Sequence, residues 1–327
     1  MPGSPFNKAP MAGSMGYDVI TILDTCVDLV VNLGDAVPEF DQKEKLVDSF
    51  SLEMGGSSCI FACQCAKLGL NTAGVGVVGK DVFGQVVTNG LISAGVNTAH
   101  LKTDDALNTG LGVLLTRGSD RAILTYSGTI GAVSREHLTD GLLRSARHLH
   151  VGSYYLLSGL RDEFPGILRR AKNFGLTVSL DTNWDPQEKW NLPAELLEHV
   201  DIILPNENEA MLLTGTGSAH EAARLLAAKV PVVAVKQGPE GGMAIKGNES
   251  VQLSAIDVQV TDTVGAGDSF DAGFIYAYLN GLTLEDCLRA GIFCGSMNTA
   301  KPGGTAGQAR LEALLGYLDH NAIPPVM

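Results

Sequence analysis

Residues 262–270 read Asp-Thr-Val-Gly-Ala-Gly-Asp-Ser-Phe and lead into an amphipathic stretch that predicts a helix over 268–279. Gly265 and Gly267 permit a sharp turn and a close approach of the backbone to a ligand. The free amide groups at the start of the helix, together with the helix dipole, form a site for an anion. The segment therefore predicts an anion-binding turn at the N-terminus of a helix.

Asp268 stands inside this turn. A carboxylate at a helix start can be an N-cap that satisfies backbone amides. A carboxylate beside an anion site can also take the proton of a hydroxyl group while the anion site stabilises a phosphoryl group in transfer. The spacing alone leaves both interpretations open.

The rest of the chain alternates strands and helices. Buried strands are predicted over 18–23, 72–78, 148–152, 177–180, 202–204 and 232–235, and helices over 57–68, 82–94, 162–174, 208–213, 220–228 and 283–298. Such alternation is typical of an α/β fold with a doubly wound, mostly parallel sheet flanked by helices. Further strands are predicted over 27–33, 45–53, 110–116 and 121–126 without helices between them. We expect these strands to form a small β-sheet that projects from the main domain.

Composition narrows the class of protein. Of the 327 residues, 45% are hydrophobic and 18% charged, as in a folded globular protein. The net charge of −13 and the lack of a basic footprint argue against a nucleic-acid partner. No apolar run reaches the roughly 18 residues of a membrane helix. The six cysteines form no Cys-x-x-Cys pair, which favours reduced thiols in a cytoplasmic protein, and residues 1–16 predict a disordered tail.

Four segments, in the right order, resemble the motifs of the PfkB-type, or ribokinase-like, carbohydrate kinases. Residues 262–270 match every fixed position of the signature Asp-Thr-x-Gly-Ala-Gly-Asp-x-Phe. Gly55-Gly56 before a helix, the turn Gly-Lys-Asp-Val-Phe-Gly over 79–84, and Asn-Glu-Asn-Glu over 206–209 resemble the other landmarks. The resemblance implies a ribokinase-like kinase domain over 17–320, with a β-sheet lid inserted roughly at 26–54 and 106–128.

The resemblance also implies a reaction and its residues. The γ-phosphoryl group of ATP would pass to a hydroxyl of a sugar or polyol, with Mg²⁺ as cofactor. Asp268 would be the catalytic base, and Gly265, Ala266 and Gly267 would form the anion hole. The implied cofactor-binding residues are Asn206, Glu209, Lys236, Gly238, Thr263 and Asn298; Glu209 would hold Mg²⁺ through water, and Asp262 would lie beside a K⁺ site. Without the resemblance, Asn206 and Glu209 would be interpreted as an ordinary helix N-terminus.

At the substrate end the resemblance implies Asp28, Gly55, Gly56, Asp181 and Asn183. An ionised Asp28 could accept two hydrogen bonds from a vicinal diol. Two positions depart from the family pattern. Ile60 replaces a substrate-binding Asn, and Asp185 replaces an Arg that can pair with the carboxylate of an acidic sugar. We therefore expect a neutral sugar or polyol.

Other functions stay open. A nucleoside kinase would satisfy Asp28 with its ribose, and a catalytically silent sugar-binding protein would explain Ile60, although the intact turn at 265–268 argues against it. Residues 74–79 fit the dinucleotide pattern Gly-x-Gly-x-x-Gly, but its glycines fall inside a strand, which disfavours an NAD-dependent oxidoreductase. The resemblance implies a homodimer formed through the lid. The sequence does not determine which sugar or hydroxyl reacts, or whether K⁺ activates.

Overall fold

The computed structural model describes residues 16–118 and 120–320; residues 1–15 of the predicted tail lie outside this range. Nine described strands form one sheet in the order β13-β12-β11-β10-β9-β8-β1-β4-β5. They are β1 (Tyr17–Ile22), β4 (Thr72–Gly79), β5 (Asn97–Asp104), β8 (Ala146–Val151), β9 (Thr177–Leu180), β10 (Ile202–Ile203), β11 (Val232–Lys236), β12 (Gly242–Lys246) and β13 (Glu249–Leu253). Neighbours from β11 to β5 pair in parallel, whereas β12 pairs antiparallel with β11 and β13. This confirms the predicted, mostly parallel sheet.

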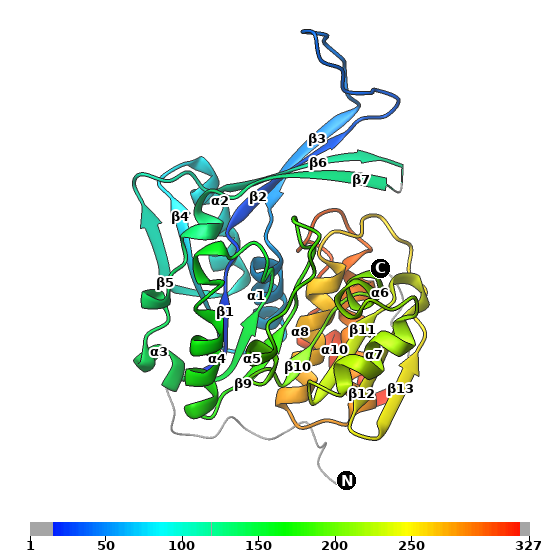
Figure 1. Cartoon of the computed structure of the whole chain (residues 1–327). Helices are drawn as coiled ribbons and strands as arrows, with labels where there is room; N and C mark the ends of the chain where they lie inside the picture. The colour runs from blue at the N-terminus through cyan, green and yellow to red at the C-terminus, as the bar shows by residue number, and fades with distance from the viewer. Residues whose placement is uncertain (1–15, 119, 321–327) are drawn as a thin grey trace.

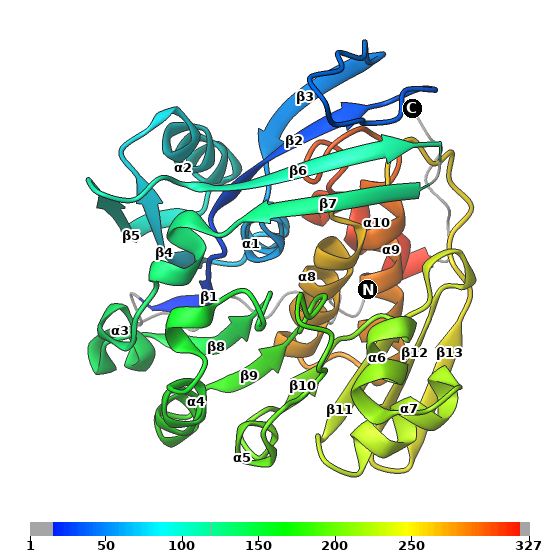
Figure 2. The ribbon, with the colours of Figure 1, turned by 45° about the horizontal axis from the view of Figure 1, so that its top comes forward.

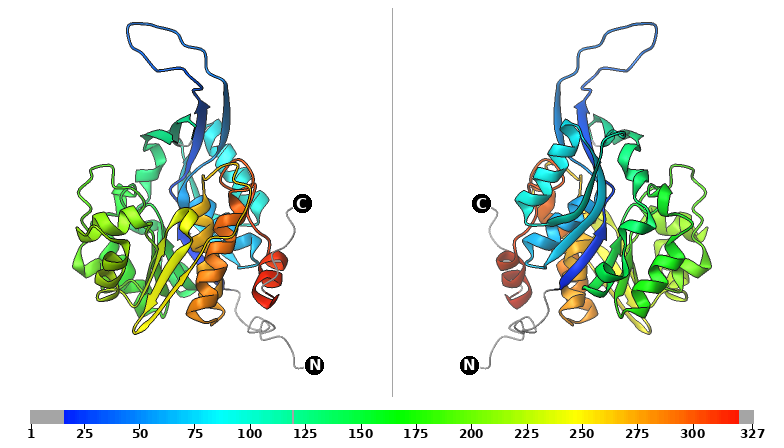
Figure 3. Two further views of the ribbon diagram at one scale, coloured as in Figure 1. Left: turned by 90° about the vertical axis from the view of Figure 1, so that its right-hand side faces the viewer. Right: turned by 90° about the vertical axis from the view of Figure 1, so that its left-hand side faces the viewer.

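Helices cover both faces of the main sheet (Figures 1 and 3). They are α1 (Ser57–Lys67), α2 (Val82–Ala94), α3 (Asp140–Arg144), α4 (Phe164–Asn173), α5 (Ala194–Leu197), α6 (Glu207–Thr214), α7 (Ala219–Ala227), α8 (Ala266–Leu279), α9 (Leu284–Asn298) and α10 (Leu311–His320). Alternate residues of β1 serve opposite faces: Ile20 and Ile22 pack with the core under α4 and α7, and Val19 packs with the core under α1, α8 and α9. None of the described helices combines the length and apolarity that a membrane crossing requires.

Four further strands form a second sheet, here called the lid sheet, in the order β3-β2-β6-β7. They are β2 (Cys26–Asn32), β3 (Ser49–Met54), β6 (Gly110–Arg117) and β7 (Asp120–Tyr126), and they project from the main domain as Figures 1 and 2 show. The predicted strand over 45–53 is therefore too long, since β3 begins at Ser49 after a long connection over 33–48.

The two faces of the lid sheet differ in chemistry. One face carries the cross-strand rows Glu53-Asp28-Gly112-Thr125 and Ser49-Asn32-Thr116-Arg121, with the more apolar row Ser51-Val30-Leu114-Ile123 between them. The opposite face carries the rows Leu52-Leu29-Val113-Leu124 and Phe50-Val31-Leu115-Ala122. Glu53 lies against Gly303 of the main domain, so the polar face is the one that turns toward the main sheet.

The carboxyl ends of the parallel strands meet at one edge of the main sheet. Asp24 follows β1, Asp181 follows β9, and Lys236 ends β11. The chain winds from β1 to β4 on one side and to β8 on the other, and ligands of doubly wound sheets bind at the carboxyl edge of such a switch point. Gly74 and Gly76 lie inside β4, where a Cβ would come within 2.6 Å and 2.9 Å of Leu23 atoms. They are packing glycines, which explains the chance fit to a dinucleotide pattern.

Candidate active site

The turn before α8 has the geometry of an anion site. Gly265 is the N-cap residue and adopts a left-handed conformation with φ 73°. A Cβ there would also lie 2.7 Å from the carbonyl oxygen of Gly304. Among the described residues no side chain caps this helix; the Ala266 amide donates to the Thr263 carbonyl at 3.3 Å, and the amides of Gly267 and Asp268 are available to a ligand.

Asp268 is the third residue of α8 and does not act as its N-cap. The pKa of its carboxyl group is raised to about 7, mainly by burial and then by the charges of Asp181 and Asp24, against the opposing effects of Lys236 and of a hydrogen bond with Ser57. A carboxylate with a pKa near the working pH is suited to general-base catalysis. Beside an uncapped helix N-terminus, Asp268 could deprotonate a hydroxyl group that attacks a bound phosphoryl group.

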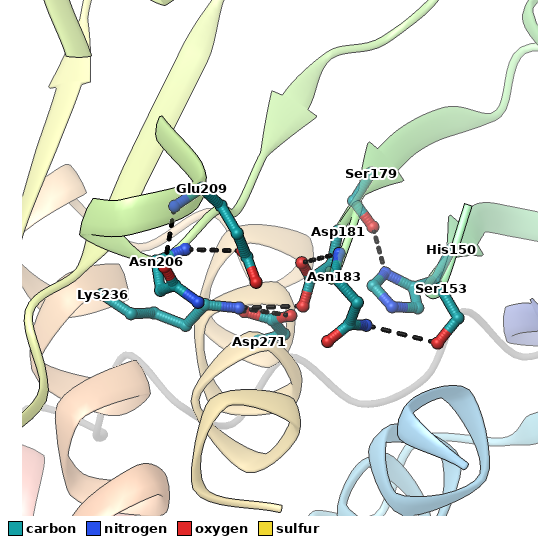
Figure 4. Close-up of polar contacts among 9 residues, drawn as sticks. All are labelled: His150, Ser153, Ser179, Asp181, Asn183, Asn206, Glu209, Lys236 and Asp271. Atoms are coloured by element: carbon teal, nitrogen blue, oxygen red, sulfur yellow. Dashed lines mark hydrogen bonds and ion pairs between the residues drawn. The ribbon is translucent and has the colours of Figure 1, made fainter. Parts of the chain in front are cut away.

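Lys236 lies next to this turn (Figure 4). A Cβ on Gly267 would lie 3.6 Å from its Nζ atom. The ammonium group forms ion pairs with Asp181 (2.9 Å) and with Asp271 (3.1 Å), which lies one turn beyond Asp268 on α8. The sequence analysis predicted Asp181 as a substrate-binding residue and did not single out Asp271. In the structure both side chains contact Lys236.

Asn206 and Glu209 begin α6 with a capping box. The Asn206 amide donates to Glu209 Oε2 and the Glu209 amide donates to Asn206 Oδ1, each at 2.9 Å. Glu209 is nevertheless buried, and burial together with Asp181 raises its pKa to about 7. Both interpretations of the pair thus have support, since the side chains cap a helix and also border the cluster around Lys236 (Figure 4).

The cluster has an excess of negative charge that a divalent cation would offset. Asp181, Glu209, Asp268 and Asp271 surround the single cation Lys236, and burial raises the pKa of three of these carboxyl groups. Carboxylate oxygens are suitable donors for Mg²⁺, which commonly keeps several waters and binds through nucleotide phosphates. No preformed cage of three or more ligands occurs in the part of the chain that the structure describes. The residues fit an ion that arrives with a nucleotide.

Asp28 occupies a slot between two glycines. A Cβ at Gly55 would collide with its carboxylate, and one at Gly112 would come within 2.5 Å of it. Burial raises the pKa of Asp28 to about 6, with Asp24 and Glu53 adding to the effect and Arg121 opposing it. In the part of the chain that the structure describes, the Asp28 carboxylate accepts a long hydrogen bond from Cys26 Sγ at 4.0 Å. Its oxygens are therefore available to a ligand.

Asp24 is a site residue that the sequence analysis missed. Its carboxylate accepts the amides of Ser57 (3.0 Å) and Ser58 (2.9 Å), which begin α1, and the hydroxyl of Ser153 (2.5 Å). It thereby fixes the predicted Gly56 turn, whose φ is 85°. An acidic residue directly after a buried parallel strand was the signal that could have identified it.

Asn183 connects Asp24 with the Lys236 cluster, through Ser153 on one side and Asp181 on the other. It has a left-handed backbone with φ 52°, and its side-chain amide donates to Ser153 Oγ at 3.3 Å. Its backbone amide donates to Asp181 Oδ1 at 3.2 Å. Behind it, Ser179 Oγ bonds His150 Nδ1 at 2.8 Å (Figure 4).

Three other predicted residues, Asp262, Thr263 and Asn298, form hydrogen bonds with the loop before α8, and a fourth, Gly238, lies near Lys236 in the chain. Asp262 accepts the amides of Val264 (3.0 Å) and Gly303 (2.9 Å). Asn298 donates to the Val264 carbonyl at 2.8 Å, and the carbonyl of Thr263 accepts from Ala266 at 3.3 Å. Gly238 follows Lys236 by two residues and has φ 54°. These contacts stabilise the loop on which the anion site lies.

Asp185 and Ile60, the two departures from the family pattern, have structural partners. The buried Asp185 carboxylate accepts the amides of Gln187, Lys189 and Trp190, each at 2.9 Å, so it caps a loop. Asp185 thus has a structural role in this loop, and the expectation that a negative charge here disfavours an acidic sugar stays a prediction. Ile60 is 3% exposed, and its methyl groups lie against Gly265 and Gly304.

Comparison with known proteins agrees with this geometry. Residues 20–310 match the family model of the pfkB family carbohydrate kinases. The chain is 27% identical to a ribokinase from Haemophilus influenzae over 87% of this chain and 94% of that protein. It is also 27% identical to a 5-dehydro-2-deoxygluconokinase from Halalkalibacterium halodurans, over 93% and 95% of the two chains.

The fold is shared as well. The structure of Arabidopsis thaliana ribokinase complexed with ribose and ATP superposes with a TM-score of 0.82 at 25% identity, over 93% of this chain and 99% of that one. The ribokinase-like architecture predicted from the sequence is thereby confirmed.

Proposed function

The chain belongs to the pfkB family of carbohydrate kinases, and on that basis we propose that it transfers the γ-phosphoryl group of ATP to a hydroxyl group of a neutral sugar or polyol. The observation that carries the proposal is Asp268, a buried carboxylate of raised pKa on the first turn of a helix that no described side chain caps. The base and the anion site that phosphoryl transfer requires are thus adjacent.

The reaction follows from the roles of these groups. Asp268 takes the proton as the substrate O–H bond breaks, and the freed oxygen forms a bond to the γ-phosphorus of ATP. The bond from that phosphorus to the bridging oxygen breaks, and ADP leaves. The amides of Gly265, Ala266 and Gly267 stabilise charge on the phosphoryl oxygens, with Lys236 beside them. Asn206 and Glu209 would hold Mg²⁺ through water, and the ion would supply neutralising charge for the phosphates.

The charge at the substrate end supports a neutral substrate. Burial and the neighbouring charges of Asp24 and Glu53 raise the pKa of Asp28, and Arg121 of the lid sheet opposes them. A substrate carboxylate placed here would meet further repulsion. A sugar diol would instead donate hydrogen bonds to Asp28. The related proteins are named for substrates as different as ribose and a dehydro-deoxygluconate, and the charge at this end supports the neutral sugar for this chain.

The nucleoside kinase remains the second candidate, since the ribose of a nucleoside would also satisfy Asp28. A silent sugar-binding protein is less well supported, because the packing of Ile60 against Gly265 and Gly304 accounts for the missing Asn without loss of catalysis. A turnover assay distinguishes both alternatives from the proposal. A nucleoside kinase would phosphorylate nucleosides, and a silent sugar-binding protein would phosphorylate nothing.

We also propose a homodimer that pairs the apolar faces of two lid sheets. Phe50, Leu52, Leu124 and Tyr126 lie on this face with exposed fractions of 73%, 40%, 63% and 52%. An exposed apolar patch of this kind is typical of an interaction surface.

We further propose a K⁺ requirement linked to Asp262. We also propose a cytoplasmic location, which the six free cysteines support.

The test is ADP release with Mg-ATP and a panel of pentoses, hexoses, inositols, nucleosides and sugar acids. Turnover restricted to neutral sugars or polyols supports the proposal. Efficient turnover of a sugar acid would overturn the charge argument, and turnover of nucleosides alone would favour the second candidate.

A further inference from the structure

The ion pairs of Lys236 are built from three separate elements. Lys236 ends β11, Asp181 follows β9, and Asp271 lies on α8. Side-chain exposures are 12% for Lys236, 3% for Asp181 and 1% for Asp271. Asp271 reaches the ammonium group with both oxygens, at 3.1 Å and 3.2 Å. The ammonium group is thus held from two sides in one position.

A buried ion pair is weak evidence for stability, because the desolvation of two charges offsets their attraction. The position of the Lys236 ion pairs in the fold indicates a functional role. The held ammonium lies beside Gly267, on the turn where the proposed phosphoryl group is bound, and it keeps some exposure there. A lysine has a long, flexible stem, so two fixed carboxylates greatly reduce the number of positions its charge can take.

We propose that Asp181 and Asp271 are positioning residues that hold the Lys236 ammonium against the phosphoryl site at the N-terminus of α8. The inference rests on the proposed kinase function and changes the role of Asp181 from a predicted substrate ligand to a partner of Lys236. Asp271 acts in the same way, although it lies on the helix that carries Asp268.

The charges that face Asp268 come from several elements. Asp181 on the β9 side, Asp24 after β1 and Lys236 on β11 act on it, and Ser57 of α1 bonds it. Asp271 lies on its own helix, and Glu209 of α6 borders the same cluster. Neutralising Asp181 removes a negative charge near Asp268, which favours ionisation of Asp268. The activity of such a variant should therefore persist to lower pH than that of the wild type.

The experiment compares Asp181→Asn, Asp271→Asn and Lys236→Met, singly and combined, in steady-state kinetics with ATP and the sugar found by the panel. Each Asn variant keeps the side-chain shape. We expect kcat to fall about 10- to 100-fold in each, with the KM for the sugar nearly unchanged. In the Lys236→Met background, adding Asp271→Asn should lower kcat by less than about a further threefold, because the effect of Asp271 acts through the lysine. The acid limb of the pH profile should move to lower pH in Asp181→Asn.

Asp140→Asn is the control, since Asp140 of α3 pairs with Arg170 of α4 at 2.5 Å and neither helix carries a residue of the described site. It should leave kcat and the pH profile unchanged, and thermal unfolding of all variants separates lost stability from lost positioning. A rise in the sugar KM alone in Asp181→Asn would return that residue to substrate binding. Fully additive losses with an unmoved pH profile would overturn the proposal. An inactive wild type would instead contradict the kinase function itself.

Discussion

Glu53 of the lid sheet lies directly against Gly303, so closely that a Cβ at Gly303 would overlap the Glu53 carboxylate. Gly303 in turn donates its amide to Asp262, whose other oxygen accepts from Val264 in the turn before α8. Glu53 is also the cross-strand partner of Asp28. The position of the lid is therefore mechanically connected to the anion site.

Replacing Gly303 with Ala should displace the Glu53 carboxylate, which lies at the flexible end of its side chain. We expect the sugar KM to rise about threefold or more, because Glu53 is the cross-strand partner of Asp28, while the KM for ATP changes less. The variant Gly247→Ala is the control: Gly247 has a left-handed φ of 57° as Gly303 has 81°, but a Cβ there meets open space. Adding Glu53→Ala to Gly303→Ala should restore part of the sugar affinity. Equal behaviour of the two Ala variants would contradict the connection.

Asp28→Asn should produce a protein that is more stable and yet does not bind sugar. The pKa of Asp28 is raised from 3.8 to about 6 on folding, so its charge opposes folding above pH 6. Removing that charge should raise the free energy of unfolding by about 1–2 kcal/mol at pH 8, after allowance for solvent screening. The gain should vanish near pH 4, where Asp28 is protonated in the folded state as well. Thermal unfolding at both pH values, with sugar binding by calorimetry, checks this trade-off.

Activity should depend on the ionisation of Asp268. Its pKa is raised to about 7, and only the ionised form accepts a proton, so kcat/KM should fall about tenfold per pH unit below that value. The measurement is a pH profile from pH 5 to 9 with saturating Mg-ATP. A flat profile down to pH 5 would show that a group of ordinary carboxyl pKa, or none, acts as the base.

Ile60→Asn tests whether this position faces the substrate or the turn. Because Ile60 is buried against Gly265 and Gly304, an Asn there should lack partners and lower the free energy of unfolding by about 1–3 kcal/mol. Ile60→Val, which keeps the apolar surface, should cost about 0.5–1.5 kcal/mol. If Asn instead improves the sugar KM without a loss of stability, the side chain faces the substrate.

The main sheet could be predicted because its central strands are continuous apolar runs between clear helical patterns. β5, β12 and β13 escaped prediction: β5 alternates exposed and half-buried residues at the sheet edge, and the hairpin β12–β13 has exposed, polar positions. α10 also went unpredicted, although it packs on α9.

The candidate site, like the main sheet, has parts that could be predicted from the sequence and parts that could not. Residues 265–268 carry their chemistry in local sequence, so the turn and the helix start were predictable. The contacts of Lys236 with Asp181 and Asp271 depend on which strands are neighbours and on which face of α8 is buried. Those are tertiary relationships: Asp181 and Asp271 lie 55 and 35 positions from Lys236 in the sequence, which does not show that they meet it.

The most direct test of the central claim compares the wild type with Asp268→Asn on the best sugar of the panel. The measurement is single-turnover transfer of the γ-phosphoryl group to the sugar, with ATP and sugar binding measured in parallel. The account predicts at least about a thousandfold loss of transfer with both affinities retained within about threefold, because the amide keeps the shape and removes the base. Transfer at the wild-type rate in Asp268→Asn would contradict the account.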